Sequence, residues 1–308
     1  MKRVPTIRLV SFVALTTVSI TGCGLTKAQK DGIGAFGKAT ANLGTASKEQ
    51  FVGGRERVIE MKRLQLAMEK KTLPARKPDG SAADRDFYAG VLDLDSGLDR
   101  QNIEQRVDAV ELLIQYGNLL VAFSEETQEK ELSAAADNFT SSIKKFPNNP
   151  LTTAEVDGLG QLVVVTGKMW VEHEKKEALK KIIPTVSPLI ERVCTVLEND
   201  FDLKKRGVAA EIFNRQDRLA NEAIDGLKRE GGSLADRLLL IDGFALADRN
   251  KSDLEATSKK LLKTVAAMRD ADKKLVSLIN DDRISLESIK SFAADAKDLA
   301  KAVKPFIK

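Results

Sequence analysis

The sequence predicts an all-α protein, an elongated antiparallel bundle of long helices. Apolar residues recur every three or four positions through most of the chain, and no segment shows the convincing alternation of a half-buried strand. Glycine, proline and capping residues break this pattern into long segments with short connections, which favours antiparallel neighbours. The chain has 308 residues, 43% hydrophobic and 31% charged, which is enough for a packed core beneath a highly charged surface.

The first 22 residues are typical of a signal peptide and are left out of the predicted fold. Lys2, Arg3 and Arg8 make this segment positive, and no acidic residue accompanies them. Residues 9–20 are uncharged and mostly apolar, too short to span a bilayer as a helix but about the length of a signal-peptide core. We therefore expect residues 1–22 to be removed from the mature protein.

Ile20, Thr21, Gly22 and Cys23 resemble the bacterial lipobox, which is an aliphatic residue, a small residue, Gly or Ala, and then Cys. The resemblance covers only this N-terminal segment, and the rest of the chain carries no family signature. It implies that diacylglycerol joins the Cys23 sulfur, that the chain is cut before Cys23, and that the new amine is acylated, for example with palmitate. Several acyl chains hold a protein on a membrane far more strongly than a single chain.

The residue that follows the cysteine bears on which membrane is reached. Lipoproteins retained in the inner membrane of Gram-negative bacteria tend to carry Asp there, whereas this chain carries Gly24. The resemblance therefore implies the outer membrane, with the protein on its periplasmic face. An ordinary secretory signal with a chance cysteine at position 23 is the alternative.

Charge and cysteine content argue against a nucleic-acid-binding protein and against a protein held by internal disulfides. The net charge of +4 falls to +1 (4 − 3) once the three cations of the signal peptide are removed, so no electrostatic footprint for nucleic acid remains. With Cys23 lipidated, Cys194 is the only other cysteine, so no disulfide can form within the chain. Cys194 lies on an apolar helical face, and we expect it to be buried.

Residues 23–72 are predicted to hold the lipidated N-terminus and a first long helix, from about Leu25 to Lys71. Gly53-Gly54 could interrupt this helix. Residues 73–98 are rich in proline and glycine breakers and are predicted to be a linker, with a short helix at 83–92.

Residues 99–308 are predicted to form the helical bundle. The expected helices are 99–124, 152–183, 189–201, 207–228, 234–247, 252–280 and 285–303. The sequence leaves open whether the first continues to Phe146, where Pro147 and Pro150 end it. Pro184 and Pro188 are expected to kink or restart the chain between the second and third.

A stripe of small residues runs along the first helix. Residues 32–37 match G-x-G-x-x-G, but no strand precedes them as a dinucleotide site requires. Gly34, Gly37, Ala41 and Gly44 instead fall on one helical face, where small side chains let another backbone approach closely. That backbone could belong to the same chain, to a second copy or to a partner. The stripe could also be partly buried in the bilayer near the anchor. A flexible tether is the remaining alternative.

His173 opens a segment that resembles the zinc-binding H-E-x-x-H pattern. Glu177 stands where the second histidine should be, and the chain has no other histidine. A zinc site and a Ser-His-Asp triad are therefore both disfavoured, and an exposed helix face is the simpler interpretation.

An acidic segment in the linker has some features of a calcium loop. Acidic residues take loop positions 1, 3, 7 and 12 as Asp93, Asp95, Asp99 and Glu104. Gly97 and Leu98 occupy the fifth and sixth positions, where a ligand and a glycine are needed. An acidic turn that caps a helix explains the pattern better.

The most apolar stretch lies at 162–171 and includes Trp170. Its length, with Thr166 and Lys168 inside it, favours a buried core helix, and a membrane-inserting element is the alternative.

These features predict a membrane-anchored periplasmic lipoprotein without catalytic activity, cofactor or metal. Its helical module would bind an envelope protein or associate with itself, at the small-residue stripe or at an exposed groove. A membrane-active protein and an enzyme with an unrecognised site are the two alternatives.

Overall fold

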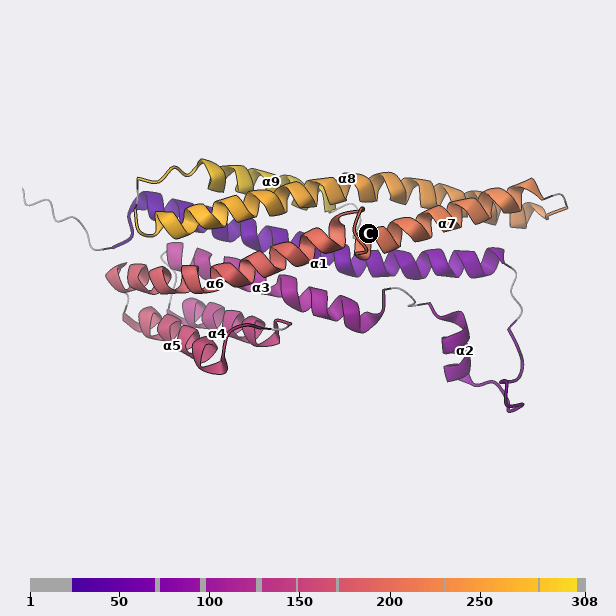
Figure 1. Cartoon of the computed structure of the whole chain (residues 1–308), viewed down its shortest axis with the longest axis horizontal. Helices are drawn as coiled ribbons and strands as arrows, with labels where there is room; N and C mark the ends of the chain where they lie inside the picture. Colours follow the sequence, from indigo (N-terminus) through magenta and orange to yellow (C-terminus); the bar gives the residue numbers. More distant parts are fainter. Residues whose placement is uncertain are drawn as a thin grey trace, which may run out of the picture.

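The predicted all-α class is confirmed. The computed structural model describes residues 24–69, 73–94, 98–125, 129–147, 149–169, 172–229, 231–281 and 283–303, and in these ranges it has nine helices and no β-strand (Figure 1). The helices are α1 (Lys27–Met68), α2 (Arg85–Leu92), α3 (Arg100–Ser124), α4 (Glu129–Lys145), α5 (Thr153–Met169), α6 (Glu172–Phe201), α7 (Val208–Lys228), α8 (Leu234–Leu278) and α9 (Glu287–Val303).

Two long helices set the shape of the molecule. α1 has 42 residues and α8 has 45, which corresponds to about 63 and 67 Å at 1.5 Å per residue. They run in opposite directions along the whole molecule, so that the start of α1 meets the end of α8 (Figure 1). The result is an elongated rod with the first residues of α1 at one end and the α7–α8 connection at the other.

The rod is thick at one end and thin at the other. Beside the first half of α1 lie α3, α9 and the second half of α8, and α6, α4 and α5 are layered around them (Figure 1). The second half of α1 packs with α7 and the first half of α8. α2 lies at the side of the bundle and has no buried residue.

The first half of α1 is buried on almost every side. Ile33, Phe36 and Leu43 are fully buried, and the Phe36 ring lies 6.5 Å from the ring of Tyr116 on α3 and 5.5 Å from that of Phe292 on α9. A helix that is apolar around most of its circumference is stable only inside other helices. α1 therefore forms part of the same bundle as the helices after residue 99.

The small-residue stripe brings the backbones of α1 and α3 together. A side-chain carbon added at Gly37 would lie 2.7 Å from the carbonyl oxygen of Gly117, and one added at Gly117 would lie 2.6 Å from the backbone nitrogen of Ala41. A carbon added at Gly44 would lie 2.9 Å from the carbonyl oxygen of Val110, and one added at Gly34 would lie 2.7 Å from the side-chain oxygen of Ser124. Gly37 and Gly117 therefore face each other across the antiparallel pair, and neither position has room for a larger residue.

The prolines of α6 do not end the helix, so the restart that the sequence allowed at Pro184 and Pro188 does not occur. Pro184 and Pro188 both lie inside α6, and the predicted helix 152–183 ends at Met169 instead. Ile183, Val186 and Ile190 of α6 are buried. Because each side chain of this kind contributes ~1.5–3 kcal/mol on burial, the packed face outweighs the ~3 kcal/mol that a proline costs a helix.

The predicted break at 248–251 and the possible interruption at Gly53-Gly54 are both absent. α8 is continuous across 248–251, because its buried face passes from Ala247 through Asn250 to Leu254 while the capping-type residue Ser252 is exposed. α1 is continuous across Gly53-Gly54, where Gly54 lets the side chain of Ile212 on α7 approach. Burial decides in both cases over the local sequence signal.

We predict that Gly117→Ala destabilises the protein by about 1–3 kcal/mol, because the new methyl group would force the α1 and α3 backbones apart. Urea unfolding followed by circular dichroism measures this change. Gly158→Ala is the matched control, since Gly158 lies inside α5 with nothing within 4 Å of an added carbon. That substitution should stabilise by about 0.5–1 kcal/mol. Equal effects of the two substitutions would contradict the tight contact.

Candidate functional site

The start of α1 is fixed firmly to the end of α8. Thr26 caps α1 in a capping box with Gln29, and the buried Gln29 amide donates to the carbonyl oxygens of Leu278 at 2.8 Å and Ile279 at 3.2 Å. The lipobox residues Ile20, Thr21, Gly22 and Cys23 lie outside the described residues. Only residues 24–26 separate Cys23 from the first residue of α1, so a lipid on Cys23 would be joined to the rod by a very short connection.

The predicted association stripe is occupied within the chain. Gly34, Gly37, Ala41 and Gly44 all contact or directly face α3, as the intramolecular interpretation of the stripe expects. The three glycines are buried, so they present no surface to a second copy, a partner or a bilayer.

The acidic residues near the linker serve the helices. Asp99 caps α3 by accepting from the backbone N–H of Asn102 at 2.9 Å, and Glu104 pairs with Arg100 at 2.7 Å. Asp93 ends α2 in the left-handed conformation, with φ of 41°. Within the described ranges, no group of three His, Cys, Asp or Glu side chains is placed to hold a metal ion. Asp95 and Gly97 lie outside those ranges.

The other residues singled out in the sequence take ordinary places. His173 is exposed near the start of α6, and Glu177 pairs with Lys180 at 2.7 Å. Cys194 is fully buried, as predicted, and this burial raises the pKa of its thiol to about 12. Trp170 lies outside the described residues, and so do the side chains of 164–169.

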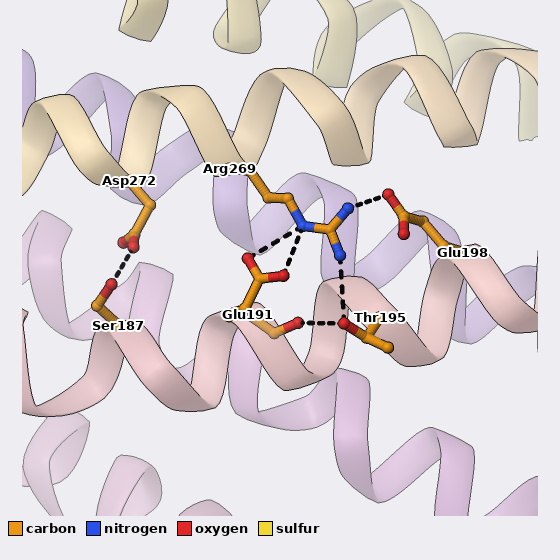
Figure 2. Close-up of polar contacts among 6 residues, drawn as sticks. All are labelled: Ser187, Glu191, Thr195, Glu198, Arg269 and Asp272. Atoms are coloured by element: carbon orange, nitrogen blue, oxygen red, sulfur yellow. Dashed lines mark hydrogen bonds and ion pairs between the residues drawn. The ribbon is translucent and has the colours of Figure 1, made fainter.

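A polar seam, which sequence reasoning missed, joins α6 to α8 (Figure 2). Arg269 of α8 donates from Nε to both carboxylate oxygens of Glu191, at 2.9 and 3.0 Å, and its two terminal nitrogens reach Glu198 and Thr195. Thr195 in turn donates to the carbonyl oxygen of Glu191 at 2.9 Å. One guanidinium thus holds three side chains spaced one helical turn apart on α6.

Asp272, one turn along α8 from Arg269, is the most unusual member of the seam. It is 5% exposed, its Oδ2 accepts from the hydroxyl of Ser187, and its Oδ1 has no partner within the described part of the chain (Figure 2). Burial raises the pKa of this carboxyl to about 6; the nearby charge of Glu191 acts in the same direction and the Ser187 hydrogen bond opposes it. The hydroxyl of the fully buried Tyr116 also lacks a partner there, and burial raises its pKa, to which the Asp272 charge adds.

The residues of the polar seam are suited to joining two helices. The Ser187 hydroxyl of α6 donates to the buried carboxylate of Asp272 on α8, so this hydrogen bond joins the two helices. Arg269 is engaged by two carboxylates. We therefore assign the six residues of Figure 2 to holding α6 on α8.

An exposed apolar surface lies at the other end of the rod. Seven large hydrophobic side chains are exposed in the described ranges, and five belong to the α7–α8 hairpin tip. These five, called here the tip patch, are Ile224, Leu234, Leu238, Ile241 and Phe244. Exposed hydrophobic residues on ordinary protein surfaces are scattered singly, whereas those of the tip patch lie together.

The core-facing side of α8 explains why this surface is exposed. Gly243 and Ala247 face the bundle, with Gly243 against Met68 of α1. At 100° per residue, Leu234, Leu238 and Ile241 fall on the opposite face of the helix. Residues 238–241 are Leu-Leu-Leu-Ile, so this turn of α8 is apolar all round, which was the available sequence signal.

One described helix, α3, has the length and composition of a membrane span, and 56% of its most apolar window is buried in the protein. α3 packs against α1, α4 and α6, which accounts for its apolar character. Comparisons with protein-family models, curated proteins and solved structures gave no match for this chain.

We predict that Asp272→Asn removes a pH dependence from the stability. The raised folded-state pKa means that Asp272 binds its proton more tightly when folded, so its contribution to stability falls as pH rises from about 4 through 6. The rise in the pKa of Asp272 from 3.8 to about 6 corresponds to at most about 3 kcal/mol of stability. Between pH 4 and about 7.5, the free energy of unfolding of the variant should therefore rise relative to that of the wild type by up to this amount.

Urea unfolding of both proteins across this pH range makes the measurement. Asp270→Asn is the control, because Asp270 lies two positions away on α8 and is exposed. Parallel stability curves for wild type and Asp272→Asn would show that the buried carboxyl does not titrate in this range.

Proposed function

We propose that this chain is a lipoprotein of the bacterial envelope, anchored through Cys23 in the outer membrane on its periplasmic face. Its helical rod acts as a non-catalytic protein-binding or scaffolding module, and the tip patch is its docking surface. The observation that carries the proposal is the gathering of exposed apolar side chains at the α7–α8 connection. This connection lies at the end of the rod opposite the first residues of α1 (Figure 1).

The length of the rod supports this division of roles. The start of α1 contacts Leu278, and Leu234 lies 44 residues away along the same continuous helix, or about 66 Å. The anchor is joined to α1 by only three residues. A rod tied so closely to a membrane would hold its tip patch tens of ångströms from its own anchor, where it could reach another molecule.

The exposed fractions also support a protein ligand. Leu234, Leu238 and Ile241 are 77%, 51% and 48% exposed and occupy positions i, i+4 and i+7 of one helix. This is the spacing of anchor residues with which a helix binds an apolar groove or another helix. A bilayer could also cover such side chains, and the second experiment below separates the two.

The anchor is tested with Cys23→Ala in the native host. Wild-type protein should fractionate with the outer membrane, and its mass should exceed that of residues 23–308 by the added acyl chains. The variant should lose both properties, because the sulfur that accepts the lipid is gone. Wild-type protein of unmodified mass in the soluble fraction would overturn the lipoprotein assignment.

The tip patch is tested by replacing Leu238 and Ile241 together with Glu in the full chain. Chemical cross-linking in living cells, followed by mass spectrometry, should show loss of the main adducts, because two charges cannot be buried at an apolar interface. Val52→Glu is the control, since Val52 is 45% exposed on α1, away from the tip.

The unfolding curves of both variants should match the wild type, because these positions are exposed. Adducts that persist in the tip variant would remove the tip patch from the proposal. Adducts to lipid alone would favour the membrane-active alternative.

A further inference from the structure

We infer that the tip patch binds a second copy of this chain, with the two α8 helices side by side and parallel. The inference is carried by the pattern of charges beside the apolar stripe. It deepens the proposed function and rests on it in one respect, because a shared membrane would align the two rods.

The stripe has the spacing of a two-stranded coiled coil. Leu234, Leu238, Ile241 and Ala245 follow one another at intervals of four, three and four residues, and all four are exposed. They therefore take positions d, a, d and a of a heptad repeat. Asp248 takes the next d position, so the contact ends at Ala245 and covers about two heptads.

The flanking charges favour the parallel orientation. In this register Arg237 is at position g and Asp242 is at position e of the following heptad. In a parallel pair, a g residue faces the e residue five positions later on the other helix, so each Arg237 would meet Asp242 of the second copy. Neither side chain has an ion-pair partner within the described part of its own chain.

The antiparallel arrangement lacks this complementarity. There, g positions face g positions and e positions face e positions, so neither Arg237 nor Asp242 would find an opposite charge. The proposed lipid anchor also favours the parallel orientation. Two rods attached to one membrane near the starts of their α1 helices would both extend away from that membrane.

The other apolar residues of the tip widen the contact. Asp217 of α7 pairs with Lys251 of α8 at 3.0 Å, and two helical turns nearer the tip the corresponding positions are Ile224 and Phe244. Phe244 also takes a g position and so flanks the stripe. Even with these residues the interface is short, and confinement to a membrane supplies the high effective concentration that a weak contact needs.

Single-cysteine cross-linking of the full lipidated chain in cells tests this arrangement. In a parallel pair, Ala245→Cys faces its own copy, and mild oxidation should give a disulfide-linked dimer. Ala235→Cys is the matched control, because Ala235 is also exposed on α8 but lies off the stripe. Cys194 is buried and does not compete for oxidation, and in the proposed lipoprotein the sulfur of Cys23 is blocked by its lipid.

Charge substitutions in the Ala245→Cys background test the orientation. Arg237→Asp and Asp242→Arg should each lower the cross-linked fraction about five-fold or more, because each turns two ion pairs into two repulsions. The double substitution restores both pairs and should restore the cross-link. Equal cross-linking at 245 and 235, or no rescue by the double substitution, would overturn the parallel dimer.

Two measurements on the same preparation separate this inference from the anchor. A chain that carries acyl mass on Cys23 but gives no dimer overturns the self-association and leaves the anchor standing. A chain that gives the dimer without acyl mass supports the self-association and overturns the anchor. If the thiol of the Ala245→Cys variant is shielded from a water-soluble maleimide by lipid and no dimer forms, the tip lies in a bilayer and the inference is overturned.

Discussion

The contact between the backbones of α1 and α3 organises the thick end of the rod. Gly37 and Gly117 face each other across the two helices, and α8 and α9 cover most of the rest of the first half of α1. A helix surrounded in this way cannot shift without disturbing each neighbour, because protein interiors are packed as densely as organic crystals. The position of α8 follows from this, since Gln29 at the start of α1 bonds the carbonyl groups at the end of α8.

This arrangement connects the core to the proposed function. Because α8 is one unbroken helix, fixing its last turn beside the start of α1 also fixes where its first turn lies, about 66 Å away. The same helix therefore carries the fastening to α1, the polar seam with α6 and the tip patch. A lipid at one end and a docking surface at the other would be joined by a single rigid element.

The polar seam shows how a helical rod can hold charges in its interior. Arg269 satisfies two carboxylates and a hydroxyl, whereas Asp272 has, within the described ranges, only the hydroxyl of Ser187 for its two oxygens (Figure 2). A buried carboxyl with one partner stores a penalty that protonation relieves. The stability of the α6–α8 contact is therefore expected to depend on pH. The tip patch lies well away from Asp272 along α8.

Local sequence patterns were sufficient for the fold class, the capped start of α3, the burial of Cys194 and the small-residue face of α1. These features depend on residues a few positions apart, whose side chains share one face of a helix whatever surrounds it. The signal peptide and lipidation of Cys23 stay predictions from the sequence, since those residues lie outside the described structure.

Other features depended on contacts between distant segments. Pro184 and Pro188 carry a helix-breaking signal, yet α6 continues because its buried face outweighs that cost. The sequence left several possible partners for the small-residue stripe of α1. The structure shows that it packs against α3 at Gly117, which lies 80 residues from Gly37 in the chain. The exposed stripe of Leu234, Leu238 and Ile241 could not be told from a core face by periodicity, because spacing gives the face of a helix but not what lies against it.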